Sequence, residues 1–400
     1  MIKRVIIVSM VAVLVLGALA GCSTSSQPTS YKVGMIAAQT GPYSALGLPA
    51  LEGMQVIAEE INKAGGINGV PLELIVYDDK SSSTETVLAA KKLIEVDKVL
   101  AFGCSSATGL SHGIVPVAND METPGIPMSG TGLINDQLGK WAFKPISSEA
   151  DYIPLPLGYL KNDHGVTKLA GLMENSGYGE GGDHYLKEVA PGMGMTIVEM
   201  QYFDPTATDM TPQLTNIKNS GAEAIFIWGS GPAGALAIKQ AREMGINLYI
   251  VTTPAQASPN YIEEFGDFYE AEPPAVCLDS KLTMWRQLPD TDPDKQMCQQ
   301  FDELYTAKYG YSPSMWAAIG AQMVQFIADG IERANPDPSN LAEARDAVRI
   351  AFESTENLSQ FMGTYTLSPT DHYGRIIPKE VLIIVKNGEK VLEKTYEQLQ

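Results

Sequence analysis

The sequence predicts an α/β protein built from two doubly wound, Rossmann-like lobes. Strand and helix patterns alternate from residue 31 to residue 130, and the same alternation starts again at residue 168. Alternating strands and helices favour a parallel sheet with helices on both faces. The 400 residues are enough for two or three domains, and a composition of 44% hydrophobic and 19% charged residues is that of a globular protein.

The first alternation consists of four strands and two helices. The expected strands are 31–38, 72–79, 99–103 and 125–130, and the expected helices are 49–63 and 84–97. The first helix is predicted because four apolar residues recur at helical spacing: Met54, Ile57, Ala58 and Ile61. Gly65 and Gly66 follow it and end it.

The second alternation has the same form and is followed by two longer helices. The expected strands are 168–175, 195–203, 222–229 and 247–254, and the expected helices are 183–190, 211–220, 233–244, 316–334 and 341–352. The chain then ends in a β-hairpin with Asn387-Gly388 as its turn. Ligands of such open sheets sit outside the carboxyl ends of the strands, so the expected site is the cleft between the lobes.

The N-terminus predicts an exported protein. Lys3 and Arg4 precede an apolar run and then small residues before Cys22. This pattern indicates a signal peptide over 1–21, with an uncleaved membrane anchor as the alternative. Leu19-Ala20-Gly21-Cys22 resembles the bacterial lipoprotein cleavage box. That resemblance implies lipidation of Cys22, anchoring to a membrane surface, and a polar tether over 22–30.

The charge, histidine and cysteine content limits the classes of partner, cofactor and cross-link that we expect. Lysine and arginine total 28 against 47 aspartate and glutamate, giving a formal net charge of −19, which argues against nucleic acid as a partner. The four histidines are scattered, and we expect no metal or cofactor. In an oxidising compartment Cys277 and Cys298 could form a disulfide, and the alternative is that they and Cys104 are buried thiols.

Motifs for catalysis are weak. Residues 229–234 (GSGPAG) match G-x-G-x-x-G between a strand and a helix, the context that a dinucleotide site requires. The strand about 20 residues further on ends in threonines and offers no acid for a ribose. A glycine-rich turn with Pro232 at the first helical position is the favoured interpretation. No G-x-S-x-G elbow is present, so we expect a binding protein and not an enzyme.

Three turns rich in small and hydroxyl residues mark the expected site. They are 39–47 (QTGPYSALG), 102–109 (FGCSSATG) and 127–132 (PMSGTG), each at or after the end of an expected strand. Such hydroxyls can simply cap a helix. With free backbone N–H groups they can also bind a carboxylate. Three such turns in one lobe exceed what capping needs, which favours ligand contact, above all at Ser105, Ser106 and Thr108.

An ordered set of stretches resembles a known family. It includes TGPYSALG, INKAGGINGVPLELIVYDDKS, AAKKLIEVDKV, SGTG, YGEG and TDMTPQLTNIKNSGAEAIFIWGSG. Together these resemble the type I periplasmic binding proteins of ABC importers, in the branched-chain amino acid branch, over nearly all of the mature chain. The resemblance implies two lobes joined by a three-strand hinge: 31–148 with 280–357, and 149–279 with 358–400.

The resemblance also implies a function. We expect an extracytoplasmic, monomeric receptor that captures a small carboxylate-bearing solute, closes its lobes and docks on an ABC permease. A branched-chain amino acid or an aromatic or branched organic acid would suit. The alternatives are a sensor for a signalling partner, a receptor for amides or ureas, and an exported nucleotide-dependent enzyme. The same fold serves transport and sensing, so the fold cannot separate them.

Site residues follow from the same resemblance. It implies that Ser106, or Ser105 one position earlier, donates a hydrogen bond to the ligand's carboxylate. The other implied contacts are Thr108, Ser129, Gly130, Thr131, Tyr178 and Tyr43. Amino-acid binders of the family hold the ammonium with an acid in the second lobe, after the strand that ends near Thr253 here.

One departure from the family concerns the ligand's amino group. Residues 252–261 (TTPAQASPNY) contain no acid, and the next one is Glu263. An ammonium buried without a counter-charge is costly. The hypothesis is therefore a ligand without an α-amino group, with Gln256 accepting one hydrogen bond in place of the acid.

Overall fold

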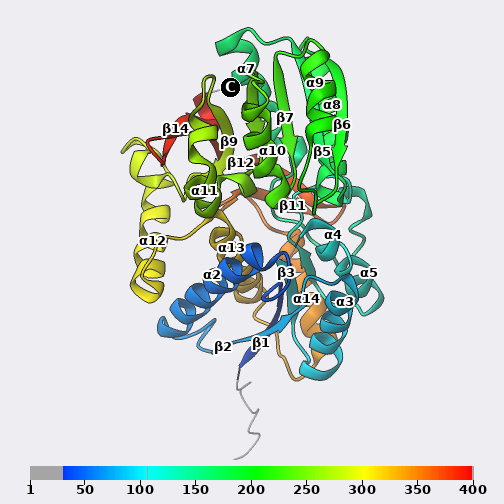
Figure 1. Cartoon of the computed structure of the whole chain (residues 1–400). Coiled ribbons are helices and arrows are strands. Elements are labelled where there is room, and N and C mark those ends of the chain that lie inside the picture. Colours follow the sequence, from blue (N-terminus) through cyan, green and yellow to red (C-terminus); the bar gives the residue numbers. More distant parts are fainter. Residues whose placement is uncertain (1–29, 106, 399–400) are drawn as a thin grey trace, which may run out of the picture.

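Two α/β lobes, one above the other in Figure 1, make up the computed structural model, which describes residues 30–105 and 107–398. The predicted signal peptide, Cys22, nearly all of the tether and Ser106 lie outside these residues. In the described part of the chain, no helix has the length and apolar character needed to cross a membrane.

The first lobe is built on a four-stranded parallel sheet in the order β2-β1-β3-β4. The strands are β1 (Tyr31–Ala37), β2 (Leu72–Asp78), β3 (Ala101–Ser105) and β4 (Gly125–Pro127). Helices α2 (Ser44–Lys63) and α13 (Met315–Ala334) pack on one face, and α3 (Ser83–Lys92) and α5 (Ile114–Asp120) on the other. Helix α14 (Leu341–Glu353) packs beside α13, and α12 (Lys295–Tyr309) joins the same core.

Helices α2 and α13 touch through their backbones. A Cβ atom added to Gly53 would lie 2.0 Å from the carbonyl oxygen of Ala317, and one added to Gly320 would lie 1.9 Å from that of Ala50. Both glycines are therefore required by a close approach and not by backbone conformation. The two helices, blue and olive in Figure 1, run side by side in the lower lobe.

The second lobe is built on a seven-stranded sheet in the order β14-β13-β9-β8-β7-β5-β6. Five strands are parallel: β5 (Lys168–Glu174), β6 (Thr196–Phe203), β7 (Ala224–Trp228), β8 (Tyr249–Thr252) and β9 (Ala275–Ser280). The hairpin of β13 (Glu380–Lys386) and β14 (Glu389–Thr395) adds two antiparallel strands beside β9. Helices α9 (Thr211–Asn219), α10 (Pro232–Glu243) and α11 (Pro259–Glu270) cover one face, and α7 (Pro154–His164) and α8 (Gly177–Gly192) the other.

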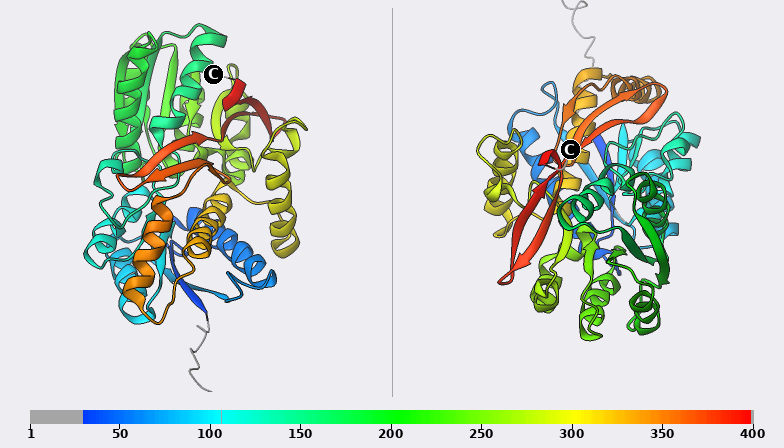
Figure 2. Two further views of the ribbon diagram at one scale, coloured as in Figure 1. Left: turned by 180° about the vertical axis from the view of Figure 1, so that it is seen from behind. Right: turned by 90° about the horizontal axis from the view of Figure 1, so that it is seen from above.

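The chain passes between the lobes three times. The first passage follows β4 and leads through Ser147 and α6 (Glu149–Tyr152) to α7, and the second follows β9. A small antiparallel sheet of β10 (Leu358–Ser359), β11 (Gly363–Ser368) and β12 (Asp371–Pro378) precedes the third. Figure 2 shows this sheet, in orange, at the level where the lobes meet. Phe361, Met362 and Leu367 pack into the first lobe's core, so the division expected at residue 358 cuts through a sheet attached to that lobe.

Buried ion pairs tie the second and third passages together. Lys281 follows β9 directly, and Lys379 directly precedes β13, which pairs with β9. Lys281 Nζ lies 3.0 Å from both Asp292 Oδ2 and Asp294 Oδ2. Lys379 Nζ contacts the other oxygen of Asp294, and it also donates to Ser359 Oγ at 2.7 Å. The carboxylate of Asp294 thus contacts both lysines, one at the end of β9 and one at the start of β13.

Of the two alternatives for Cys277 and Cys298, the disulfide is wrong. Both residues are buried thiols. Cys277 lies on β9 in the second lobe's core, whereas Cys298 lies on α12 in the first lobe's core. Burial raises the pKa of each thiol to about 12. The two cysteines are close in the sequence, but the sequence alone did not show that they belong to the cores of different lobes.

Several expected elements differ in extent from the observed ones. The helix expected over 84–97 is α-helical only to Lys92, and Leu93–Asp97 forms a π-helical turn that ends at Lys98 with φ of +60°. The strand expected over 125–130 ends at Pro127, which frees the SGTG turn for the cleft. The helix expected from residue 183 begins at Gly177, so Tyr178 lies in its first turn, facing the first lobe.

Candidate ligand-binding cleft

A cavity lies where the two lobes face each other. The space between its walls that is not filled by atoms is about 600 Å³ with the adjoining open solvent included, and both lobes line it. Its apolar walls include Leu46 of α2, Met128, Ile146, and Met315, Trp316 and Ile319 of α13. Its polar groups are Thr108, Ser147, Tyr152, Tyr178, Ser230 and Glu380. A mainly apolar pocket with a few polar groups is typical of small-molecule sites.

Three of the sequence-predicted site residues line this cavity: Thr108, Gly130 and Tyr178. Thr108 begins the short helix α4 (Thr108–Ser111) after β3, and Gly130 lies in the turn after β4. Tyr178 reaches across from α8 and comes within hydrogen-bond distance of Tyr152, with the two hydroxyl oxygens 3.2 Å apart. Tyr152 in turn donates to the carbonyl oxygen of Gly130 at 3.3 Å. Burial raises the pKa of both tyrosines, so they are neutral phenols.

Ser105, Ser129 and Thr131 are buried beside the cavity and are not part of its lining. Ser129 Oγ lies 2.8 Å from His112 Nε2 and accepts a hydrogen bond from the Thr131 N–H at 3.3 Å. Burial and the charge of Lys144 lower the pKa of His112 to about 4, so its ring is neutral at pH 7. Their described contacts hold the SGTG turn in place. Ligand contact by these three residues stays a prediction.

Tyr43 and Gln256 lie outside the cavity lining as well. Tyr43 is half-buried just before α2. Gln256 is fully buried, and its side-chain amide is used within the second lobe. Its Nε2 donates to the Gly231 carbonyl at 3.0 Å, and its Oε1 accepts from the hydroxyls of Thr252 and Thr253. The structure therefore does not present Gln256 to a ligand.

The glycine-rich turn at 229–231 holds a carboxylate of the chain itself. Glu174, at the end of β5, is 1% exposed. Its Oε2 accepts from the N–H groups of Ser230 at 3.1 Å and Gly231 at 3.2 Å, and its Oε1 accepts from Ser230 Oγ at 3.1 Å. Backbone N–H groups of such a turn are the ones that would hold a phosphate. Glu174 occupies them, which opposes the dinucleotide interpretation.

Most of the cavity lining was missed by the sequence reasoning, including two polar residues that contact each other. Ser147 and Glu380 come from the first and third passages between the lobes, 233 positions apart, and they are hydrogen-bonded to each other. Glu380 is 1% exposed, and burial raises the pKa of its carboxyl group to about 8. The only signal was a glutamate that opens the otherwise apolar strand EVLIIV.

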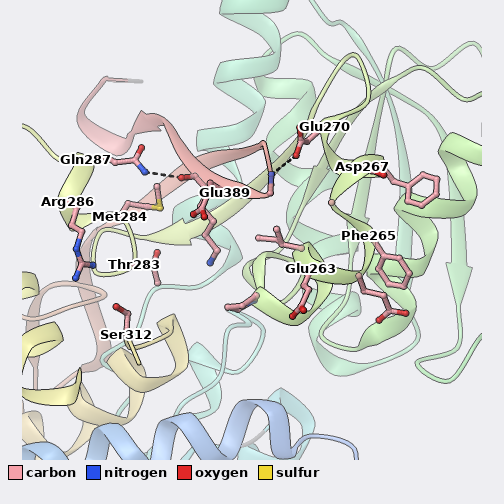
Figure 3. A pocket seen from close by; sticks show the side chains of 17 residues that line it. Glu263, Phe265, Asp267, Glu270, Thr283, Met284, Arg286, Gln287, Ser312 and Glu389 are labelled. Atoms are coloured by element: carbon pink, nitrogen blue, oxygen red, sulfur yellow. Dashed lines mark hydrogen bonds between the residues drawn. The ribbon is translucent and has the colours of Figure 1, made fainter. Parts of the chain in front are cut away.

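A larger and more open groove lies elsewhere, between α11, residues 283–287 and the tip of the β13–β14 hairpin (Figure 3). Gln287 Nε2 donates to the Lys390 carbonyl at 2.9 Å, and the Gly388 N–H donates to Glu270 Oε1 at 2.7 Å. Glu263 and Asp267 of α11 and Glu389 of the hairpin make it acidic (Figure 3). None of the predicted site residues lines this groove, so the cavity between the lobes is the candidate site.

The sequence pattern of the family described as periplasmic binding protein matches residues 30–375. The chain belongs to this family. This periplasmic binding protein is 24% identical over 337 residues to the leucine-, isoleucine-, valine-, threonine-, and alanine-binding protein of Pseudomonas aeruginosa, across 82% of this chain and 85% of that protein.

Solved structures share the fold. An extracellular ligand-binding receptor from Rhodopseudomonas palustris superposes with a TM-score of 0.83 at 26% identity, covering 91% of this chain and 99% of that one. The branched-chain amino acid transporter substrate-binding protein LivJ from Streptococcus pneumoniae, in complex with isoleucine, superposes with a TM-score of 0.76 at 23% identity, covering 91% and 99%. The predicted type I periplasmic binding protein fold is confirmed. The chain is a solute receptor, and its family is not an enzyme family.

Proposed function

We propose that this chain captures a small carboxylate-bearing solute with an apolar body and presents it to an ABC permease. The cavity between the lobes carries the proposal, because both lobes contribute to its lining and most of that lining is apolar. The named relatives support it: one binds leucine, isoleucine, valine, threonine and alanine, and another holds isoleucine. Through lipidated Cys22, the receptor works outside the cytoplasm at a membrane surface.

The carboxylate end of the solute lies on the first lobe. Thr108 and Gly130 line the cavity there, and the predicted contacts Ser105, Ser129 and Thr131 are buried in the same strand-end segments. These groups are hydroxyls and backbone amides, which donate hydrogen bonds to an anion without a full positive charge. Trp316, Ile319 and Leu46 then cover the apolar part of the solute.

The second lobe completes the site by closing. Tyr178 and Ser230 belong to it, so a solute on the first lobe gains their contacts only in the closed form. The favourable free energy of those contacts shifts the equilibrium from the open form toward the closed form. The closed form is the one that the permease accepts, and the receptor carries out no reaction on the solute.

A thermal-shift screen tests the proposed function. L-leucine, L-isoleucine, L-valine, L-phenylalanine, 4-methylpentanoate and 3-phenylpropanoate are added to the purified receptor. A ligand at 100 times its Kd stabilises the folded state by about 2.7 kcal/mol, which raises the unfolding temperature. L-leucinamide, which lacks the carboxylate, is the matched control and is expected to have no effect. The proposal is wrong if none of the carboxylates shifts the transition.

Thr108→Val is expected to weaken binding of the responding solute by about 10- to 100-fold, the effect of losing a hydrogen bond to a charged group. Valine keeps the shape of threonine and removes the hydroxyl. Calorimetric titration measures the loss, with Thr215→Val on the exposed face of α9 as the control. Unchanged affinity would show that Thr108 serves only the local structure of α4.

A further inference from the structure

The lining of the cavity includes a carboxyl group, that of Glu380, with one oxygen that has no hydrogen-bond partner among the described residues. Glu380 lines the cavity at the point where the third passage enters β13, and it is 1% exposed. Its Oε1 accepts a hydrogen bond from Ser147 Oγ. Its Oε2 is buried and has no hydrogen-bond partner among the residues that the structure describes. Buried polar atoms in native structures almost always have a partner, so an orphan oxygen in a ligand cavity indicates a group that the ligand supplies.

Among the residues whose side chains the structure describes, no basic side chain forms an ion pair with Glu380, whose described side-chain contact is Ser147. The groups that interact with it electrostatically are Asp151 of α6, Tyr152, Tyr178 of α8 and Tyr365 of β11, which are acidic or neutral. Its sequence neighbour Lys379 is directed to Asp294 and Ser359 instead. Glu380 is also the one carboxyl group among the described residues that line the cavity.

We propose that Glu380 Oε2 receives the protonated amino group of the ligand, so that the receptor binds a zwitterionic α-amino acid with an apolar side chain. This inference rests on the proposed function and names its ligand class. The carboxylate lies at the donor-rich end near Thr108 and Gly130, and the ammonium lies at the acceptor, Glu380. The acid comes from the third passage and not from the segment after β8, where Gln256 is occupied.

The hypothesis of a ligand without an amino group, drawn from residues 252–261, is thereby replaced. Its physical premise was correct, because a buried ammonium needs a counter-charge. The acid that meets this need is 127 positions beyond Thr253 in the chain, at the start of β13. A ligand that is only a carboxylate would instead leave Glu380 Oε2 without a donor, in a cavity with no basic side chain in its described lining.

Proton release should accompany binding. Burial raises the pKa of Glu380 to about 8, so without a cationic partner the carboxyl group is mostly protonated at pH 7. Pairing with an ammonium requires the ionised form, and the proton leaves to the buffer. Affinity for an amino acid should therefore rise by up to about tenfold per pH unit from ~6 to ~8 and then level off. Titrations in buffers of different ionisation enthalpy should show close to one proton released near pH 7.

Matched pairs of probes provide the direct test. L-leucine is compared with 4-methylpentanoate, and L-phenylalanine with 3-phenylpropanoate, by calorimetry on the wild-type receptor and on Glu380→Gln. In the wild type, the amino member of the responding pair should bind at least about 30-fold more tightly than its analogue. Glu380→Gln should weaken the amino member by about 100-fold and leave the analogue unchanged or improved. Glu389→Gln, in the open groove, is the control and should bind as the wild type does.

The outcomes separate the two proposals. If the analogue binds as tightly as the amino acid, or if binding takes up a proton, the assignment of Glu380 is overturned and the proposed function stands. If no member of either pair binds, the proposed function fails and the assignment fails with it. The comparison of pairs and the proton count both use the wild-type receptor, so they decide the question even if Glu380→Gln does not fold.

Discussion

Asp294→Ala is expected to lower the free energy of unfolding by about 3–5 kcal/mol, the cost of removing one partner of a buried ion pair. Lys281 is fully buried and keeps Asp292 and Glu397 as partners after the substitution. Among the described residues Lys379 keeps the hydroxyl of Ser359 and no acid, so its charge stays buried without an ionic partner there. The effect should be large because a single carboxylate serves both strands that cross between the lobes.

Urea unfolding followed by circular dichroism measures this loss. Asp290→Ala is the matched control: Asp290 pairs with Lys295 at 2.8 Å, but its side chain is 97% exposed. Exposed ion pairs contribute little to stability because water screens them, so this variant should unfold at nearly the wild-type urea concentration. Equal effects of the two substitutions would show that burial of the network contributes nothing to stability.

Glu174→Ala should destabilise the second lobe and also weaken ligand binding. It removes the acceptor of two backbone N–H groups and one hydroxyl in the turn at Ser230 and Gly231. Each donor left buried without a partner costs about 1–3 kcal/mol, less where water enters the space. Because Ser230 lines the cavity, loosening the turn should also lower affinity for the responding solute by about tenfold.

The measurements are thermal unfolding and calorimetric titration on the same variant. Glu188→Ala serves as the control, since Glu188 on α8 is 62% exposed and pairs only with His184 at 3.3 Å. If nucleotides such as NAD bound to Glu174→Ala and not to the wild type, the carboxylate would be shown to block a working phosphate site. Wild-type stability in Glu174→Ala would show that water replaces the carboxylate without loss.

Much of the fold could be predicted because the strands of both parallel sheets are short apolar runs separated by helical patterns. β5, β7 and β9 are almost entirely buried, and such strands stand out in the sequence. The strand-end turns also lead to the candidate cavity, since Thr108 and Gly130 line it, and their contact with a ligand stays a prediction. Both conclusions depend on local patterns and on a general rule for sheets.

The rest of the site depends on contacts between distant segments. Glu380 reaches the cavity only because the third passage brings β13 beside β9, and Ser147 meets it from the first passage. No local pattern marks either residue as part of a site. Glu174 shows the same limit: GSGPAG gave the shape of an anion-binding turn, but not that a carboxylate from β5 fills it.

The contact between α2 and α13 has a consequence for how a solute is received. Gly53 and Gly320 let the two helices meet backbone to backbone, so neither helix can slide past the other. Leu46 on α2 and Trp316 and Ile319 on α13 face the cavity from this joined pair. The first lobe therefore offers a preformed wall, and under the proposed function little conformational entropy is lost there on capture. The contacts that the second lobe makes with the solute, through Tyr178 and Ser230, then depend on closure of the two lobes.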